Sequence, residues 1–343
     1  MKHTVRTRLV TFVVAAAIVM ASVAVSSIPG AKASPRVLAD KACGPVTEQG
    51  IAWPKRACKY PPNQQEYVWV AANIADPFYA IGNSAWRTAG RTLGVKVSLV
   101  GPQTADVSQQ VSIMRQLIAK PTTAGILMYA IDYHALQPIM IQARKAGIPV
   151  IDGNGDWTNH AVRDAFVGTA NQALGSSAAD LVGQLLKGKG TVGIVSLITA
   201  QNHQERVAGF RAELKAKYPH ITILGIAAED GTPTVEQKAA GAFLSAHPNV
   251  NLLWTTDAGS AYVATQVKQQ GMAGKVKLVG TDRSPAEIAG ICSGEVYATI
   301  TQDTYSEEYT SLNYLYWLYN KKATVPDSTI TKPAIVTKKN AHC

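Results

Sequence analysis

Polar side chains recur in this sequence directly after short apolar runs, in a pattern suited to holding a small molecule. The first run, residues 67–72, is followed by Asp76 and by two adjacent aromatic residues, Phe78 and Tyr79. The residues that follow later runs are Asp132, Asn154, Gln204, Thr256, Asp257, Asp282 and Gln302. Acidic and amide groups bind hydroxyls, and flat rings cover apolar C–H surfaces. Together these residues predict a site for a neutral, polyhydroxylated ligand.

Each of these residues also has a structural explanation. Asp132, Asp257 and Asp282 each stand before a helical pattern, where an aspartate often caps the helix or forms a turn. Phe78 and Tyr79 could pack the start of the first helix. The binding hypothesis therefore requires a fold that brings the set to one place.

Strand-like runs alternate with helical patterns along most of the chain, and this alternation sets the expected fold. Examples are the helix predicted over 107–119 and the strand predicted over 252–255. Val- and Ile-rich strands separated by helices are typical of parallel sheets, because parallel neighbours need crossover connections. The alternation begins again after residue 168. We therefore expect an α/β protein of two doubly wound parallel-sheet lobes joined by a multi-strand hinge.

The expected lobes define where a ligand would bind. The N-terminal lobe is predicted to hold residues 67–168 plus 302–328, and the C-terminal lobe residues 169–301 plus 329–343. Ligands of such sheets bind outside the carboxyl ends of the strands, which predicts a cleft between the lobes. The chain is expected to cross near Gly168, Thr301 and Ser328. So few crossings would allow the lobes to close by hinge rotation.

The first 33 residues have the features of a secretory signal peptide. A basic head is followed by an uncharged apolar run over 9–25 and by the small-x-small sequence Ala31-Lys32-Ala33. An uncleaved anchor is the alternative. Residues 34–66 are proline-rich and are predicted to form an irregular extension. We expect a periplasmic or otherwise extracytoplasmic protein, without stable membrane insertion once the signal is cleaved.

All four cysteines lie after the predicted cleavage site. An even number of cysteines in an exported protein indicates disulfides, and four cysteines allow three pairings. Cys43 and Cys58 flank one short loop, which leaves Cys292 for Cys343. We therefore predict these two disulfides.

Other functional classes have little support in the sequence. The formal net charge is +10, and the four basic residues of the signal reduce it to +6 (10 − 4), with no Lys- or Arg-rich run, so no nucleic-acid partner is expected. Residues 188–193 match GxGxxG but follow a helix and open a strand, unlike a dinucleotide loop. The histidines, including His134, His203 and His247, are scattered and expected on the surface or in loops. We therefore predict no catalytic residues, no cofactor and no metal ion.

Residues 67–336 contain several phrases, in order, that resemble one family. The phrases are Asp76-Pro77-Phe78-Tyr79, Ala146-Gly147-Ile148-Pro149-Val150, Arg206-Val207-Ala208-Gly209-Phe210, Ala246-His247-Pro248, Leu278-Val279-Gly280-Thr281-Asp282 and Ala298-Thr299-Ile300-Thr301-Gln302. The chain resembles the periplasmic sugar-binding proteins of the ribose/galactose type, which are the receptors of bacterial ABC transporters. The resemblance implies the type I periplasmic binding protein fold, an ABC transporter permease as partner, stacking by Phe78 and Tyr79, and hydrogen bonds from Asp282 and Gln302.

The sequence also departs from the ribose-type pattern. Gln204 replaces an arginine, Thr256 replaces the usual asparagine, Asn154-Gly155 replaces an Asp-Arg pair, and Gly231 replaces an aromatic residue. These differences argue against ribose itself. Residues 100–102, Val-Gly-Pro, resemble the rhamnose and furanosyl-autoinducer receptors of the same superfamily. The alternative function is therefore a ligand-sensing receptor of this fold that signals to a sensor kinase.

Overall fold

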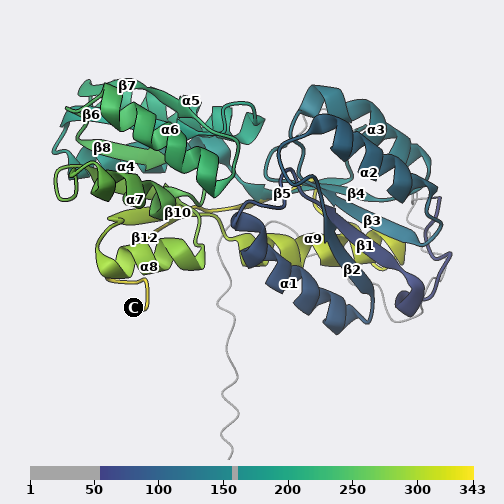
Figure 1. Cartoon of the computed structure of the whole chain (residues 1–343). Helices are drawn as coiled ribbons and strands as arrows, with labels where there is room; N and C mark the ends of the chain where they lie inside the picture. The colour runs from purple at the N-terminus through teal and green to yellow at the C-terminus, as the bar shows by residue number, and fades with distance from the viewer. Residues whose placement is uncertain (1–54, 157–160) are drawn as a thin grey trace, which may run out of the picture. The chain divides into compact units, whose positions relative to one another are not determined.

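The computed structural model describes residues 55–156 and 161–343 (Figure 1). The predicted signal peptide, residues 1–33, lies outside the described residues, as does most of the predicted extension over 34–66. A short 3-10 helix, Pro62–Gln64, leads into the first strand.

The first sheet consists of six parallel strands in the order β11-β5-β4-β3-β1-β2. Its strands are β1 (Glu66–Val70), β2 (Lys96–Val100), β3 (Thr123–Met128), β4 (Val150–Gly153), β5 (Ala165–Thr169) and β11 (Ser328–Thr331). The helices packed on it are α1 (Phe78–Leu93), α2 (Val107–Ala119), α3 (Tyr133–Lys145) and α9 (Thr304–Tyr319). This sheet and its helices form the first lobe.

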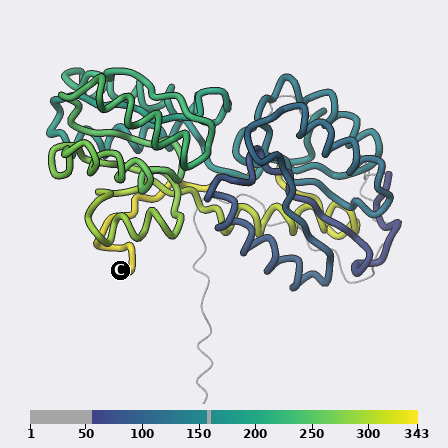
Figure 2. Tube along the Cα trace, viewed as in Figure 1, coloured from purple at the N-terminus to yellow at the C-terminus, as the bar shows by residue number. Residues whose placement is uncertain are grey.

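The central strand β1 explains why the first sheet is covered on both faces. Successive side chains of a strand point to opposite faces. Tyr67 and Trp69 pack in a cluster with α1 and α9, while Val68 and Val70 pack with α2 and α3. Figure 2 shows that the purple segment around β1 and the yellow helix α9, which are far apart in sequence, belong to the same lobe.

The second sheet also has six strands, in the order β12-β10-β9-β8-β6-β7, with only β12 antiparallel to its neighbour. Its strands are β6 (Lys189–Ser196), β7 (His220–Ala228), β8 (Leu252–Thr255), β9 (Lys277–Thr281), β10 (Ala298–Thr301) and β12 (Ala334–Thr337). Its helices are α4 (Asn171–Leu185), α5 (Gln201–Lys217), α6 (Pro233–Ala246), α7 (Ser260–Gln269) and α8 (Pro285–Ser293). The second lobe is therefore doubly wound like the first.

The chain passes between the lobes at three places. It leaves the first sheet after β5, returns after β10 and leaves again after β11. The third crossing was predicted near Ser328, which is wrong by a few residues. Ser328 to Thr331 pair with β5, so the crossing lies at residues 332–333. In the sequence, β11 and β12 look like one continuous extended segment. The point at which the chain changes from one sheet to the other therefore could not be predicted from the residues.

One of the two predicted disulfides is described completely. Cys292, in the last turn of α8, is bonded to the C-terminal Cys343, which confirms this pairing. The predicted partner of Cys58 is Cys43, which lies outside the described residues. No helix in the described part of the chain is long and apolar enough to span a membrane.

Candidate functional site

The loop after β1 contributes the first group of predicted residues. Asp76 Oδ1 accepts a hydrogen bond from the Phe78 backbone N at 2.8 Å and so forms the turn that starts α1. Phe78 and Tyr79 are both buried in the aromatic core of the first lobe, where each packs against Tyr129. The Tyr79 hydroxyl accepts a hydrogen bond from the Ala72 backbone N at 2.9 Å. Tyr79 therefore packs the start of the helix, which is the structural explanation given above for this residue.

Arg206 in α5 connects several elements of the site, and it is only 1% exposed. Its Nε donates to Asn171 Oδ1 at 3.0 Å and its Nη1 donates to the Thr256 carbonyl at 2.7 Å. Its Nη2 donates to Asn154 Oδ1 at 3.2 Å, and Asn171 Nδ2 donates to the Asn154 carbonyl at 2.6 Å. Asn154 follows β4 of the first lobe, so this arginine links the two lobes. Arg206 was not among the predicted site residues, although it begins one of the family phrases.

Asp282 and Gln302 form the second predicted group, and the structure brings them together. They follow the neighbouring strands β9 and β10, and Gln302 Nε2 donates to Asp282 Oδ1 at 2.8 Å. Both side chains are buried, and Gln302 Oε1 has no hydrogen-bond partner among the described residues. Burial raises the pKa of Asp282, while the charge of Arg206 and the hydrogen bonds from Gln302 oppose that change.

Thr256 and Asp257 follow β8 and are also buried. The Thr256 hydroxyl lies 2.7 Å from His203 Nδ1 and donates to Ser196 Oγ at 2.9 Å. Burial, and then repulsion from Glu229, raises the pKa of Asp257. Burial and the charge of Asp257 likewise raise the pKa of Asp76, so a carboxyl of the first lobe interacts electrostatically with one of the second.

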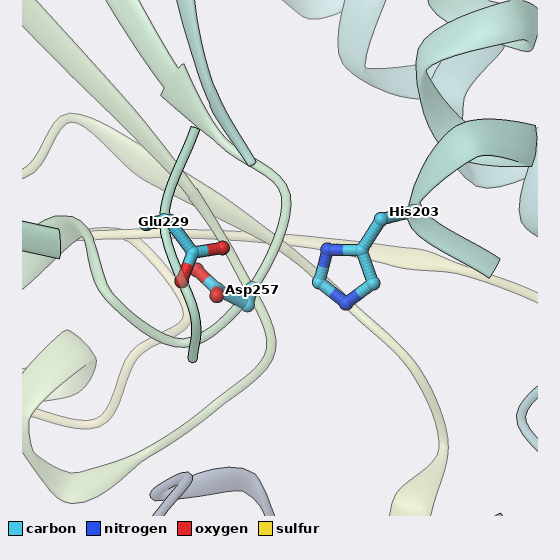
Figure 3. Close-up of side chains that lie close together, drawn as sticks. All are labelled: His203, Glu229 and Asp257. Carbon is cyan, nitrogen blue, oxygen red and sulfur yellow. The ribbon is translucent and has the colours of Figure 1, made fainter. Parts of the chain in front are cut away.

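His203 and Glu229 were not predicted as site residues. The expectation that His203 lies on the surface is wrong, because it is buried on the first turn of α5 beside the ends of β7 and β8. Burial and the positive charge of Arg206 lower its pKa well below the usual range of an imidazole. Figure 3 shows the carboxyl groups of Glu229 and Asp257 side by side, with the ring of His203 facing them from α5.

Asp132 and Gln204 do not join these residues. Both are exposed: Asp132 Oδ1 caps α3 by accepting from the Ala135 backbone N at 3.0 Å, and Gln204 Nε2 donates to the Ile198 carbonyl at 2.8 Å. They line a cavity of about 440 Å³ whose residues come from both lobes, among them Tyr133 and Gln172. In this structure Asp132 caps a helix and Gln204 bonds to the Ile198 carbonyl, so neither is bonded to Asp282 or Gln302, and a role for Asp132 and Gln204 in ligand binding stays a prediction.

These features define the class of the protein. Two doubly wound lobes, three crossings between them and buried polar side chains at the carboxyl ends of both sheets are the features of a two-lobe binding protein. A family model described as a periplasmic binding protein domain matches residues 67–323. The chain belongs to this family, which confirms the resemblance and the fold predicted from the sequence.

Curated relatives and solved structures agree with this assignment. The D-ribose/D-allose-binding protein of Pseudomonas aeruginosa is 30% identical over 206 residues, which are 57% of this chain and 63% of that protein. The match thus spans less than two thirds of that relative. The D-allose-binding periplasmic protein of Escherichia coli is 26% identical over 247 residues, which are 69% of this chain and 79% of that protein. An ABC transporter solute-binding protein from Burkholderia graminis, solved in complex with D-arabinose, is 26% identical with a TM-score of 0.77, and the match covers 82% of this chain and 98% of that one.

Proposed function

We propose that this chain is an extracytoplasmic solute-binding protein, which captures a neutral sugar or polyol between its lobes and delivers it to the permease of an ABC transporter. The family assignment and the sugars named for the relatives support a sugar as ligand. The observation that carries the proposal is the buried pair Asp282–Gln302, in which Gln302 Oε1 has no partner among the described residues. A buried acceptor without a partner costs free energy, which a ligand hydroxyl could recover.

The proposed contacts follow from the chemistry of each side chain. Asp282 and Gln302 accept hydrogen bonds from sugar hydroxyls, as does Asp76 from the first lobe. Phe78, which adjoins Asp76 at the start of α1, is the ring proposed to cover an apolar face of the sugar. Arg206 is shared among three protein acceptors and holds the loops around the ligand rather than pairing with an anion.

Acidic sugars are expected to bind poorly. Asp76 and Asp282 would repel a second carboxylate, and Arg206 already donates to Asn154 and to other acceptors. An anionic ligand would therefore have to displace existing hydrogen bonds before it found a positive partner.

A thermal-shift screen of monosaccharides, polyols and sugar acids tests the ligand class, because a ligand that binds only the native state raises the melting temperature. We expect a neutral sugar or polyol to raise it and the matching uronic acid to leave it unchanged. Gln302→Ala should lose most of the shift, and Glu213→Gln, which alters an ion pair with Lys217, is the control that should keep it. No response to any neutral compound, or an equal loss in both variants, would refute the proposal.

Delivery to a transporter is a separate claim with its own test. Deleting the gene should abolish uptake of the ligand found in the screen. If uptake is unchanged and a ligand-dependent response of a sensor kinase is lost instead, the protein is the signalling receptor considered above.

A further inference from the structure

Three side chains of the second lobe converge on one point that the proposed sugar contacts do not use. His203 lies on α5, Glu229 follows β7 and Asp257 follows β8, and they are 6%, 7% and 5% exposed. One potential ligand atom from each lies within 4.8 Å of the other two (Figure 3). Some point must therefore lie within about 2.8 Å of all three atoms (4.8 Å divided by √3). Inward movement of under about 1 Å would then reach the roughly 2.0–2.2 Å of Zn²⁺ bonds to nitrogen and oxygen.

The carboxyl groups of Glu229 and Asp257 hydrogen-bond to each other, and burial raises the pKa of both, but one oxygen of each is left without a partner in the described chain. Glu229 Oε1 and Asp257 Oδ1 have no hydrogen-bond partner among the described residues, and the same is true of Oε1 of the neighbouring buried Glu236. The other carboxylate oxygen of Glu229 accepts from the Gly231 backbone N. Buried carboxylate oxygens without partners are costly, which points to a missing positive charge.

Arg206, whose charge lowers the pKa of Asp257, does not supply that charge by direct pairing. The Arg206 guanidinium donates to Asn171, to the Thr256 carbonyl and to Asn154, and none of these acceptors is a carboxylate. A cation between Glu229 and Asp257 would meet their unpartnered oxygens directly.

The donor set indicates which cation fits. The ring of His203 is fixed by the Thr256 hydroxyl at 2.7 Å from Nδ1, and that hydroxyl is fixed in turn by Ser196. Such outer hydrogen bonds commonly orient histidines that bind metal ions. One imidazole nitrogen with two carboxylates suits Zn²⁺ or Mn²⁺, whereas Ca²⁺ and Mg²⁺ prefer oxygen ligands alone.

We propose that His203, Glu229 and Asp257 form a binding site for one divalent cation, with Zn²⁺ preferred. The ion joins α5 to the loops after β7 and β8. It thereby fixes the edge of the second lobe that also carries Thr256. The sequence shows no metal motif because the three ligands are separated by 26 and 28 positions and meet only in the folded lobe.

The test uses the exported chain without an affinity tag, dialysed against EDTA and then freed of it. Titration calorimetry should show one Zn²⁺ per chain, weaker binding of Mn²⁺ and no binding of Ca²⁺ or Mg²⁺. Glu229→Gln, Asp257→Asn and His203→Gln should each weaken Zn²⁺ binding by at least about 100-fold, since even outer partners of a metal ligand contribute roughly 10- to 100-fold. The control His247→Gln removes a histidine that packs on Phe243 instead and should bind like the parent chain.

A second measurement separates loss of the site from loss of the fold. In EDTA, Glu229→Gln should melt at or above the temperature of the parent chain, because a neutral amide relieves the repulsion and keeps an acceptor for Gly231. In saturating Zn²⁺ the order should reverse. Zn²⁺ binding that is absent, or that is equally tight in the variants of all three ligands, would overturn the proposal.

The same variants distinguish a metal ion from a charged ligand group. If glucosamine raises the melting temperature in EDTA, and Glu229→Gln abolishes that shift, the carboxylates bind a ligand ammonium group and the metal proposal is wrong. Because the titration needs no sugar, its failure would leave the proposed sugar-binding function standing.

Discussion

The Glu307 carboxyl is placed where the crossings between the lobes meet, and it should make stability depend on pH. Glu307 lies in the first turn of α9, just after the second crossing, and is 1% exposed. Its Oε1 accepts from the Thr169 hydroxyl at 2.8 Å and from the Thr331 hydroxyl, at the ends of β5 and β11. Burial raises its pKa to about 7, and Asp282 and Asp303 add to the effect, while the hydrogen bonds from the two threonines oppose it.

The sign and size of the pH dependence follow from that pKa. In the unfolded chain Glu307 has its ordinary pKa of 4.5, whereas in the folded protein the pKa is about 7. Between these values the folded chain keeps a proton that the unfolded chain has lost. The contribution of Glu307 to the free energy of unfolding is therefore full below about pH 4.5, falls as the pH rises to 7 and is level above it. The loss is about 3 kcal/mol at 1.36 kcal/mol per pH unit.

Glu307→Gln tests this prediction, because the amide keeps an acceptor for the threonine hydroxyls and cannot ionise. Urea unfolding at pH 5, 6, 7 and 8 should show the variant gaining about 2.5 kcal/mol relative to the parent chain between the ends of the series, because part of the loss has already occurred at pH 5. Glu213→Gln, in an exposed ion pair with Lys217, is the control and should show no comparable trend. A difference between Glu307→Gln and the parent chain that stays constant with pH would refute the assignment of a raised pKa to this hinge carboxyl.

Three further predictions concern the disulfide, the lobe-linking arginine and hinge closure. Replacing Cys292 and Cys343 by serine should cost up to about 4 kcal/mol of unfolding free energy, since the bond closes a loop with a sequence separation of 51; two-state denaturation of both forms checks this, and equal stability would contradict it. Arg206→Lys should weaken ligand binding by about tenfold in calorimetry, because a single ammonium group cannot keep the bonds to Asn154, Asn171 and the Thr256 carbonyl together; unchanged affinity would show that this linkage is unimportant. Saturation with a verified ligand should lower the radius of gyration in small-angle scattering, and an unchanged radius would count against hinge closure.

The fold could be predicted because its signals are local and repeated. The expected helix over 107–119 and the expected strand over 252–255 coincide with α2 and β8. Each of these elements shows its own apolar pattern, and the order of strands and helices implies a parallel sheet. The residue at which β11 ends could not be predicted in this way. It is set by pairing with β5, which is far away in the sequence and leaves no local pattern.

The candidate site was only partly predictable, because a side chain's direction depends on tertiary packing. Asp282 and Gln302 were found because both follow strands, and neighbouring strand ends meet in a sheet. On α5 the prediction chose Gln204, whereas the buried residue is Arg206, two positions later. Two positions correspond to about 200° around a helix, so these side chains point in nearly opposite directions. Glu229 was missed because its burial depends on where the loop after β7 lies relative to the loop after β8, two strands away in the sheet.

Calorimetric titration of the identified sugar into the parent chain and into Asp282→Ala, Phe78→Ala and the double variant tests the central claim most directly. Asp282→Ala leaves ligand hydroxyls without a partner in a buried site, which should cost about 2–4 kcal/mol, or roughly 30- to 1000-fold in affinity. The double variant should bind still more weakly because it also loses the ring of Phe78. Affinity that is unchanged in the double variant would contradict the account, since the sugar would then bind elsewhere on the protein.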